Sequence, residues 1–499
     1  MLSHGKDLNN WKLKHELAVV AVILTAFLLA CYFVTLKVTP IWLDEVTVAD
    51  PAINFVLGNG FVSTGWQYQP KEEFWASNAP LHQFLLVGWL ELWGVSPVVA
   101  RSINYFYAII MGLLIWGACK RSGLVKTSIS RVCLLFSILG AAGVSTNYVS
   151  GRYDPIGMLL VSMLFFLFTY PDSLKKWLTV LCVSMFLPIA GINLLPYCFL
   201  VIGLLFFFTP KKTLLRFSFT MGIGIFIGLS VLLAIYYYNG VMGRILESAG
   251  GHGLSGAVGE SAGGVQAGGV GDKVNWVISN IGIIIENRFQ NLTQWYLINR
   301  SYLILLAGMC YCIFMAWRSP SKNKIIVMAL FAVFVPLVMG GLRNYPFYYT
   351  WMAVIPMAIL FYATLSEIPK HHTLFVAIIF SVVIVYPGYG RYFIKSLVNG
   401  NSLKDSYYIS FEEIKSELKQ DDKVYASFSA YYPTVQTVDY VLLPTYKDML
   451  TAKEKSEVNV LIVPAEKFEQ EKALFGGDWK LIKTSNLQHP YNLSIYRKI

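Results

Sequence analysis

The chain contains a series of continuous apolar segments, each close to the length that a helix needs to cross a bilayer. A crossing helix requires about 20 predominantly apolar residues. Such segments occur at 17–38, 97–119, 129–149, 155–170, 177–191, 193–209, 214–238, 301–317, 324–341, 347–365 and 373–387. A bilayer offers no water to exposed backbone groups, so only helices or a closed barrel can cross it, and continuous rather than alternating apolar runs favour helices. The sequence therefore predicts a polytopic α-helical membrane protein with about eleven transmembrane helices.

The composition excludes a soluble or a disordered protein. Charged residues make up 14% of the 499 residues and hydrophobic residues 56%, whereas soluble domains carry about 25% charged residues. The net charge of +11 lies in the membrane part, because residues 400–499 hold 13 Lys or Arg against 14 Asp or Glu. A topology signal explains this basic excess better than a nucleic-acid surface does, and no nucleic-acid partner is expected.

Basic residues in the short polar joints predict the orientation. These joints lie at 120–126, 175–176, 211–216, 318–324 and 370. All fall on the side of the N-terminus, which predicts a cytoplasmic N-terminus and, with eleven spans, a C-terminal region on the outer face of the cell's inner (plasma) membrane. Pro80–Trp93 is apolar but only about 14 residues long. We interpret it as an interfacial or re-entrant helix, because a full span there would place Lys120 and Arg121 outside.

The predicted domains are a transmembrane module at 1–387, with outer loops 39–96 and 239–300, and an extracytoplasmic α/β domain at 388–499. The second loop includes a Gly-rich segment at 249–271, which favours a flexible loop over a lid that closes on substrate. The C-terminal domain shows short strand and helix patterns and is assigned a structural or acceptor-docking role. The strands are expected at Val424–Phe428, Tyr440–Leu443, Val458–Val463 and Leu493–Tyr496, and the helices at Phe411–Lys419 and Ala465–Leu474.

Two acidic residues, Asp44 and Glu45, follow the first predicted span directly. Ionisable groups at a membrane edge are costly and often mark function. Asp44 suits the N-terminus of a helix over 46–57, where a carboxylate is stabilised by the helix dipole. It also suits a general base that takes a proton from a hydroxyl nucleophile. Both interpretations stay open on this motif alone.

A second motif, Arg152-Tyr-Asp154, lies between the third and fourth predicted spans, on the same outer side as Asp44. The pair suits a structural contact at a helix start before Pro155, or an arginine that grips a phosphate while the carboxylate orients it. Further outer-side candidates suit a lipid-linked phosphate and its sugar, although the tyrosines are also typical of an aromatic belt. They are Lys71, Asn78, His82, Arg343, Tyr345, Tyr348 and Tyr349.

The order of these motifs carries a family resemblance. Asp-Glu after the first span is followed by Ala-Pro-Leu-His at 79–82, Gly-Val-Ser at 94–96 with Ala100-Arg101, and Gly-Arg-Tyr-Asp at 151–154. This pattern resembles the GT-C superfamily of membrane glycosyltransferases, and within it the group of protein O-mannosyltransferases and lipid A aminoarabinose transferases. The resemblance is clearest over 38–160 and extends weakly over 343–356. Ala79 replaces the first proline of the family's Pro-Pro-Leu element, and Asn78 stands where a Lys or His is common.

The resemblance implies a reaction and roles for the candidate residues. A sugar would pass from a polyprenyl-phosphate carrier to a lipid, glycan or protein acceptor, with inversion at the anomeric carbon. Asp44 would be the base and Glu45 its catalytic partner, and Tyr345, Tyr348, Asn78 and His82 would bind substrate. The donor phosphate would be bound by Arg152, Asp154, Lys71 and Arg343. No cofactor is certain; a divalent metal between Asp44 and the phosphate is compatible with this chemistry without being required.

Other function classes use the same intramembrane charges. A transporter or lipid flippase of envelope polysaccharide assembly would use them as a substrate path, but the sequence contains no internal repeat of the kind typical of transporters. A polysaccharide polymerase or ligase and a non-catalytic envelope scaffold are further alternatives. The transferase interpretation requires that Asp44, Glu45 and Arg152 lie together on one side of the membrane.

Overall fold

The computed structural model describes most of the chain. The described residues are 13–66, 69–77, 79–192, 194–198, 211–244, 299–317, 322–342, 347–368 and 370–499, with 279, 282, 286 and 290.

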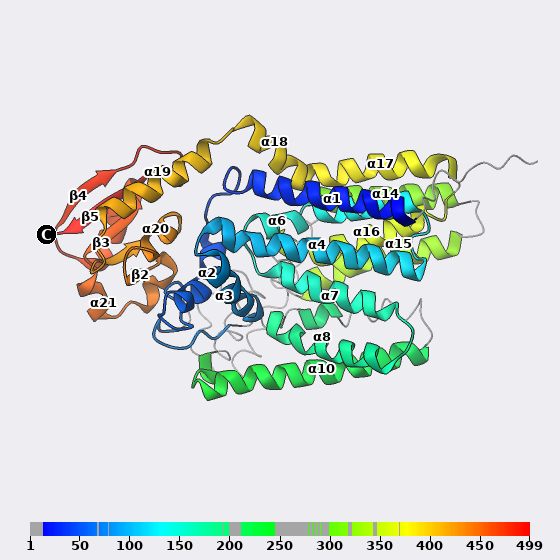
Figure 1. Ribbon diagram of the computed structural model, residues 1–499, viewed down its shortest axis with the longest axis horizontal. Coiled ribbons are helices and arrows are strands. Elements are labelled where there is room, and N and C mark those ends of the chain that lie inside the picture. Colours follow the sequence, from blue (N-terminus) through cyan, green and yellow to red (C-terminus); the bar gives the residue numbers. More distant parts are fainter. Residues whose placement is uncertain are drawn as a thin grey trace, which may run out of the picture.

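Long helices run roughly parallel to one another and form a bundle that makes up most of the molecule (Figure 1). Its helices are α1 (Leu13–Val34), α4 (Pro97–Ser122), α5 (Ser128–Gly140), α6 (Val144–Val149), α7 (Asp154–Phe168), α8 (Leu174–Ala190), α10 (Lys211–Tyr238), α14 (Arg300–Ala316), α15 (Lys322–Leu342), α16 (Trp351–Leu365) and α17 (Lys370–Val385). Within the described residues, five helices are long and apolar enough to cross a membrane, and three further apolar helices are shorter. The mostly helical fold is thus as predicted, while the number of eleven spans stays a prediction.

Ten of the predicted spans coincide with helices, and most of the segment predicted at 193–209 lies outside the described residues. The span predicted at 129–149 is two helices, because the chain turns between α5 and α6. Gly143 has a φ of +85° in this turn, and a Cβ there would collide with the hydroxyl of Thr350. Gly388 packs against the same turn, where a Cβ would collide with the backbone of Gly140 and Ala142.

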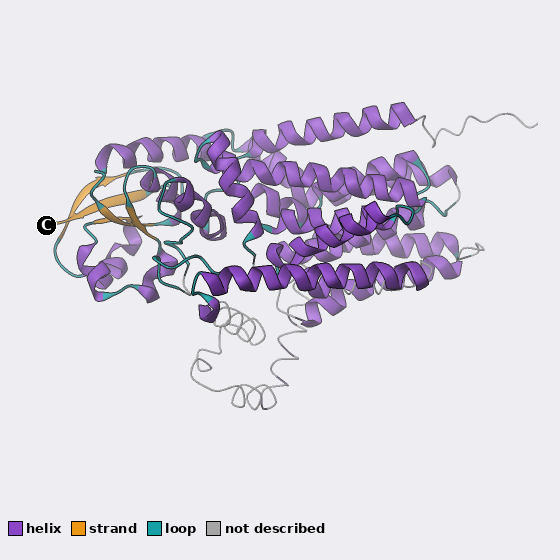
Figure 2. Cartoon of the chain, turned by 60° about the horizontal axis from the view of Figure 1, so that its bottom comes forward, coloured by secondary structure: helices purple, strands orange, loops and turns teal. Residues whose placement is uncertain are grey.

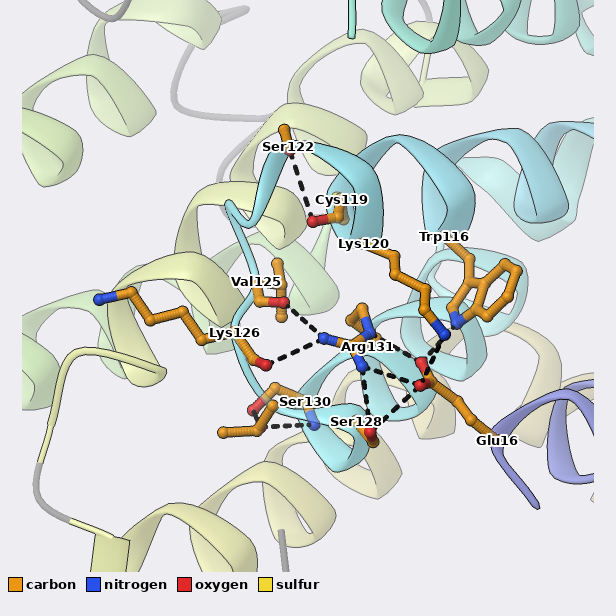
Figure 3. Close-up of polar contacts among 11 residues, drawn as sticks. Glu16, Trp116, Cys119, Lys120, Ser122, Val125, Lys126, Ser128, Ser130 and Arg131 are labelled. Atoms are coloured by element: carbon orange, nitrogen blue, oxygen red, sulfur yellow. Dashed lines mark hydrogen bonds and ion pairs between the residues drawn. The ribbon is translucent and has the colours of Figure 1, made fainter. Parts of the chain in front are cut away.

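A buried ionic cluster joins the first turns of α1 to the joint between α4 and α5 (Figure 3). Glu16 is 1% exposed, and Arg131 donates to both of its carboxylate oxygens at 2.7 and 2.8 Å. Trp116, Lys120 and Ser128 complete its hydrogen bonds. Because so many donors surround one buried carboxylate, we assign this cluster to fixing α1 against its neighbours.

Two shorter helices lie at the other end of the bundle, between it and the C-terminal domain (Figure 1). They are α2 (Leu43–Val56) and α3 (Leu81–Trp93). The α3 helix covers the segment that the sequence predicts to be interfacial or re-entrant, and its 13 residues are too few for a full crossing.

Two short connections, a π-helical turn and the turn at 399–401, lead from the bundle to the C-terminal domain. After α17 (Lys370–Val385), a π-helical turn (Tyr386–Gly390) leads into α18 (Arg391–Val398), and the predicted domain boundary at 387/388 falls at the kink that Gly388 makes in this turn. The next helix is α19 (Ser402–Glu417), which opens the domain.

The C-terminal domain contains a five-stranded sheet with helices packed on it, at one end of the molecule (Figure 2). The strands are β1 (Lys423–Ala426), β2 (Tyr440–Leu442), β3 (Val460–Pro464), β4 (Trp479–Thr484) and β5 (Leu493–Lys498), in the order β2-β1-β3-β5-β4. The first three strands are parallel, and β5 and β4 add as antiparallel strands. The short helices are α20 (Tyr431–Val435), α21 (Ala452–Glu457) and α22 (Phe468–Phe475). A small α/β domain is therefore present, with one strand more than the sequence predicts.

Candidate active site

Asp44, Arg152 and Asp154 form one contact cluster at the end of the bundle that faces the C-terminal domain. Arg152 Nη1 donates to Asp44 Oδ2, and Arg152 Nε donates to Asp154 Oδ2 at 2.9 Å. The side chains of Arg152 and Asp154 are 3% and 2% exposed, while that of Asp44 is 26% exposed. The structure thus joins the two motifs through one guanidinium, and Asp44 is the member that a substrate can reach.

The segment before Arg152 is held in place by backbone contacts. Gly151 has a φ of +71°, and a Cβ there would lie 2.9 Å from Glu45 Cγ, so this close approach to α2 requires glycine. The indole of Trp42 donates to the carbonyl of Ser150 at 2.8 Å, and Asn104 Nδ2 donates to the carbonyl of Arg152 at 2.8 Å. These bonds fix the backbone that carries the guanidinium.

Aromatic side chains enclose the Arg152–Asp154 pair. The guanidinium carbon of Arg152 lies 3.4 Å from the centroid of the Tyr348 ring, a cation–π contact. Trp351 Nε1 donates to Asp154 Oδ1 at 3.2 Å, and the hydroxyls of Tyr153 and Tyr349 are 2.8 Å apart. These partners leave Arg152 few conformations, which suits a fixed anion contact.

Glu45 lies next to Asp44 in sequence but faces away into a separate ion pair. It is 0% exposed, and Arg101, also 0% exposed, donates to its two oxygens at 2.8 and 2.7 Å. Arg101 also donates to the carbonyls of Thr39 and Pro40 at 3.0 and 3.1 Å. The geometry therefore favours a role for Glu45 in positioning α2 against α4 and the end of α1.

Lys71 and His82 contact other parts of the molecule. Lys71 Nζ lies 3.7 Å from Glu454 and 3.6 Å from the centroid of the Tyr440 ring, both in the C-terminal domain. His82 is 1% exposed, its Nδ1 has no hydrogen-bond partner among the residues that the structure describes, and burial lowers its pKa to about 3. The substrate-binding role expected of His82 stays a prediction, for an imidazole that is neutral and buried.

Three candidates, Asn78, Arg343 and Tyr345, lie outside the described residues. The Gly-rich segment 249–271 also lies outside them.

A divalent cation does not fit the cluster as it stands. Asp44 and Asp154 are both paired with the Arg152 guanidinium, which occupies the position between the carboxylates that a cation would need. Among the residues that the structure describes, no group of three His, Cys, Asp or Glu side chains is placed to hold a metal ion.

Sequence reasoning missed three residues that shape the site: Asn104, Trp351 and Asp50. Asn104 is a fully buried polar residue in an apolar helix, a signal of function or of a specific contact. Trp351 follows the tyrosines at 348 and 349, but its bond to Asp154 has no local sequence signal. Asp50 lies on α2 between Ala49 and Pro51 in the sequence and is 0% exposed.

Comparison with known proteins identifies the fold. No protein-family model and no curated protein sequence matches the chain. Among solved structures, ArnT from Cupriavidus metallidurans bound to undecaprenyl phosphate is 12% identical with a TM-score of 0.58, covering 96% of this chain and 98% of ArnT.

Two larger enzymes are also similar. The Archaeoglobus fulgidus oligosaccharyltransferase tethered with an acceptor peptide is 11% identical with a TM-score of 0.52, covering 93% of this chain and 70% of that protein. The arabinofuranosyltransferase AftD from Mycobacteria is 9% identical with a TM-score of 0.53, covering 98% of this chain and 40% of AftD. The resemblance to GT-C glycosyltransferases is therefore confirmed at the level of the fold.

Proposed function

We propose that this chain is a glycosyltransferase that moves a sugar from a polyprenyl-phosphate carrier to a lipid, glycan or protein acceptor. The contact of Asp44 with Arg152 carries the proposal, because it puts an accessible carboxylate beside a fixed guanidinium. The fold supports it, since the similar ArnT structure holds undecaprenyl phosphate. We place the reaction at the outer face of the cytoplasmic membrane, with the N-terminus cytoplasmic, because of the charges in the polar joints.

In this proposal Asp44 is the general base. The acceptor hydroxyl attacks the anomeric carbon as its proton passes to Asp44, and the bond from that carbon to the phosphate oxygen breaks. The electron pair leaves with the polyprenyl phosphate, whose developing charge must be stabilised by cations or hydrogen-bond donors. A single displacement of this kind inverts the configuration at the anomeric carbon.

The net charge of the cluster argues against Arg152 acting alone on the phosphate. One guanidinium between Asp44 and Asp154 leaves the group with a net charge of −1 when both carboxylates are ionised. A phosphodiester adds a further negative charge, so binding requires another cation nearby. Arg343 is our candidate for that cation. Lys71 could serve only after leaving Glu454, 3.7 Å from its ammonium group.

The role of Asp44 as the general base is tested by a variant that should lose turnover but still bind the lipid carrier. Purified full-length protein is incubated with lipid-linked sugars extracted from host membranes, and mass spectrometry follows the release of polyprenyl phosphate. Binding is measured separately with undecaprenyl phosphate. Asp44→Asn should abolish release and keep binding, whereas Glu91→Gln, at an exposed position on α3, should change neither.

The same variant separates the alternatives. A transporter, flippase or scaffold would release no polyprenyl phosphate even as wild type. Full turnover in Asp44→Asn would remove Asp44 from the role of base. Mass spectrometry of envelope glycans and lipids in a strain lacking the gene would identify the sugar and the acceptor.

A further inference from the structure

Helix α2 carries a second carboxylate, Asp50, six residues after Asp44. The side chain is 0% exposed and receives five hydrogen bonds from residues that the structure describes. Four come from nearby residues: Asn54 Nδ2 at 2.9 Å, Ser63 Oγ at 2.7 Å, and Thr64 through its amide at 2.6 Å and its hydroxyl at 3.1 Å. These bonds tie the outer loop to α2.

The fifth hydrogen bond comes from the C-terminal domain. The hydroxyl of Tyr431, the first residue of α20, donates to Asp50 Oδ1 at 2.6 Å, and Tyr431 is itself 0% exposed. Residues 50 and 431 are 381 positions apart in the chain. One buried bond therefore joins the helix that carries Asp44 to the separate α/β domain.

The environment of Asp50 makes this bond important. Burial raises the pKa of Asp50, and the hydrogen bonds from Tyr431 and its other partners oppose that effect only in part. A buried carboxylate whose described partners are hydroxyl and amide groups depends on every donor, because each missing donor leaves charge uncompensated. Loss of the hydrogen bond from the Tyr431 hydroxyl to Asp50 should therefore displace α2.

The C-terminal domain also holds the chain on both sides of α2. Tyr491 accepts a hydrogen bond from the amide of Ile41 at 3.2 Å, just before the helix. In the outer loop, the Leu443 amide donates to the carbonyl of Thr64 at 3.3 Å and the Thr445 hydroxyl donates to that of Gly65 at 2.5 Å. The C-terminal domain thus packs against α2, which carries Asp44, and against the segments before and after this helix.

We propose that the C-terminal domain positions Asp44 for catalysis, through the contact of Tyr431 with Asp50. Tyr431 and Asp50 are positioning residues, and the proposal rests on the transferase function proposed above. A general base must be held close to the productive geometry, and a displacement of about 1 Å can cost on the order of 100-fold in rate. The domain then contributes directly to the rate of transfer, beyond any role in acceptor docking.

The test uses full-length protein and a matched pair of tyrosine variants. Tyr431→Phe removes the hydroxyl that reaches α2. Tyr425→Phe removes a hydroxyl that donates to Glu471 at 2.9 Å within the C-terminal domain, from a tyrosine that is also 0% exposed. We expect Tyr431→Phe to lower kcat about tenfold, with undecaprenyl phosphate binding unchanged, and Tyr425→Phe to leave both unchanged.

A double-mutant cycle shows whether Tyr431 acts through Asp50. Asp50→Asn should lower kcat by itself, and adding Tyr431→Phe should lower it little further, because the two changes break one interaction. Thermal midpoints identify a purely structural effect: equal kcat for Tyr431→Phe and wild type, with only a lower midpoint, would overturn the proposal. So would full additivity in the cycle.

Failure of this inference differs from failure of the proposed function. If Asp44→Asn is inactive while Tyr431→Phe keeps the wild-type kcat, the transferase proposal stands and the positioning role falls. If Asp44→Asn keeps full turnover, the base itself is wrong, and so is the positioning of that base by the domain.

Discussion

Replacing Arg101 by methionine should destabilise the fold strongly, because it breaks a completely buried ion pair. Arg101 and Glu45 are both 0% exposed, and two hydrogen bonds of 2.7 and 2.8 Å join them. Removing one partner of such a pair costs about 3–5 kcal/mol, since the remaining charge stays buried without compensation. The carbonyls of Thr39 and Pro40 also lose their donor from Arg101.

The matched variant removes both charges at once. Combining Arg101→Met with Glu45→Gln leaves no uncompensated carboxylate, so the double variant should be more stable than Arg101→Met alone. The free energy of unfolding is measured by thermal or denaturant unfolding of purified protein in detergent. If Arg101→Met unfolds like wild type, or the double variant is the less stable of the two, the electrostatic reasoning is wrong.

The same variants decide between a positioning and a catalytic Glu45. The sequence resemblance predicts a catalytic partner for Asp44, whereas the contacts favour a structural pair. A positioning role predicts that the double variant keeps measurable turnover when Asp44→Asn has none. A folded double variant as inactive as Asp44→Asn would restore Glu45 to the catalytic residues.

Four further predictions test the site and the topology. Arg152→Ala should weaken undecaprenyl phosphate binding by about 1.5–3 kcal/mol, the range for hydrogen bonds to charged groups; an unchanged dissociation constant would remove Arg152 from the phosphate site. Tyr348→Phe should keep that affinity and Tyr348→Ala should lower it, because the ring 3.4 Å from the guanidinium supplies the contact; equal affinities would contradict this. Although burial alone would raise the pKa of Asp422, hydrogen bonds from Arg497 and the Lys419 amide and the charge of Arg497 lower it overall. The ionised carboxylate therefore stabilises the fold above the ordinary carboxyl pKa, and this stabilisation is lost as the pH falls through the lowered pKa. In acid unfolding, Asp422→Asn should lose less free energy of unfolding over that pH range than the wild type does. Lys453 lies in the C-terminal domain and its side chain is 82% exposed. The cysteine of a Lys453→Cys variant should therefore react with a membrane-impermeant thiol reagent in intact cells, and labelling only after lysis would reverse the proposed orientation.

The continuous apolar segments predicted most of the helices, and each error has a cause in the packing or exposure of the segment concerned. An apolar run gives no sign of the turn between α5 and α6, because that turn depends on Gly143 and its close approach to Thr350. The missed strand β4 is an edge strand whose side chains are mostly exposed. Its lysines and polar flanks are typical of a protected edge, and they also hide the strand from a search for apolar alternation.

Besides Tyr348, predicted as an outer-side aromatic residue, the site could be predicted where its residues are marked by charge next to a span. Asp44 and Arg152 were found in this way, and the fold brings them into contact across 108 positions of sequence. The partner of Glu45 was not predictable, since no local pattern pairs residue 45 with residue 101. Asp50 and Tyr431 were missed for the same reason, because their bond depends on how a distant domain packs.

The cluster around Glu16 has a consequence for how the chain is made. Glu16 precedes its main partner Arg131 by 115 positions. At about 5–20 residues per second, the ribosome needs on the order of 6–23 s to make that intervening stretch. During this interval the first helix carries an acidic group that has not yet met its arginine. Helix α1 therefore reaches its final packing position only after α5 has been synthesised. In a nascent chain truncated before Arg131, the carboxylate of Glu16 should be accessible to chemical modification.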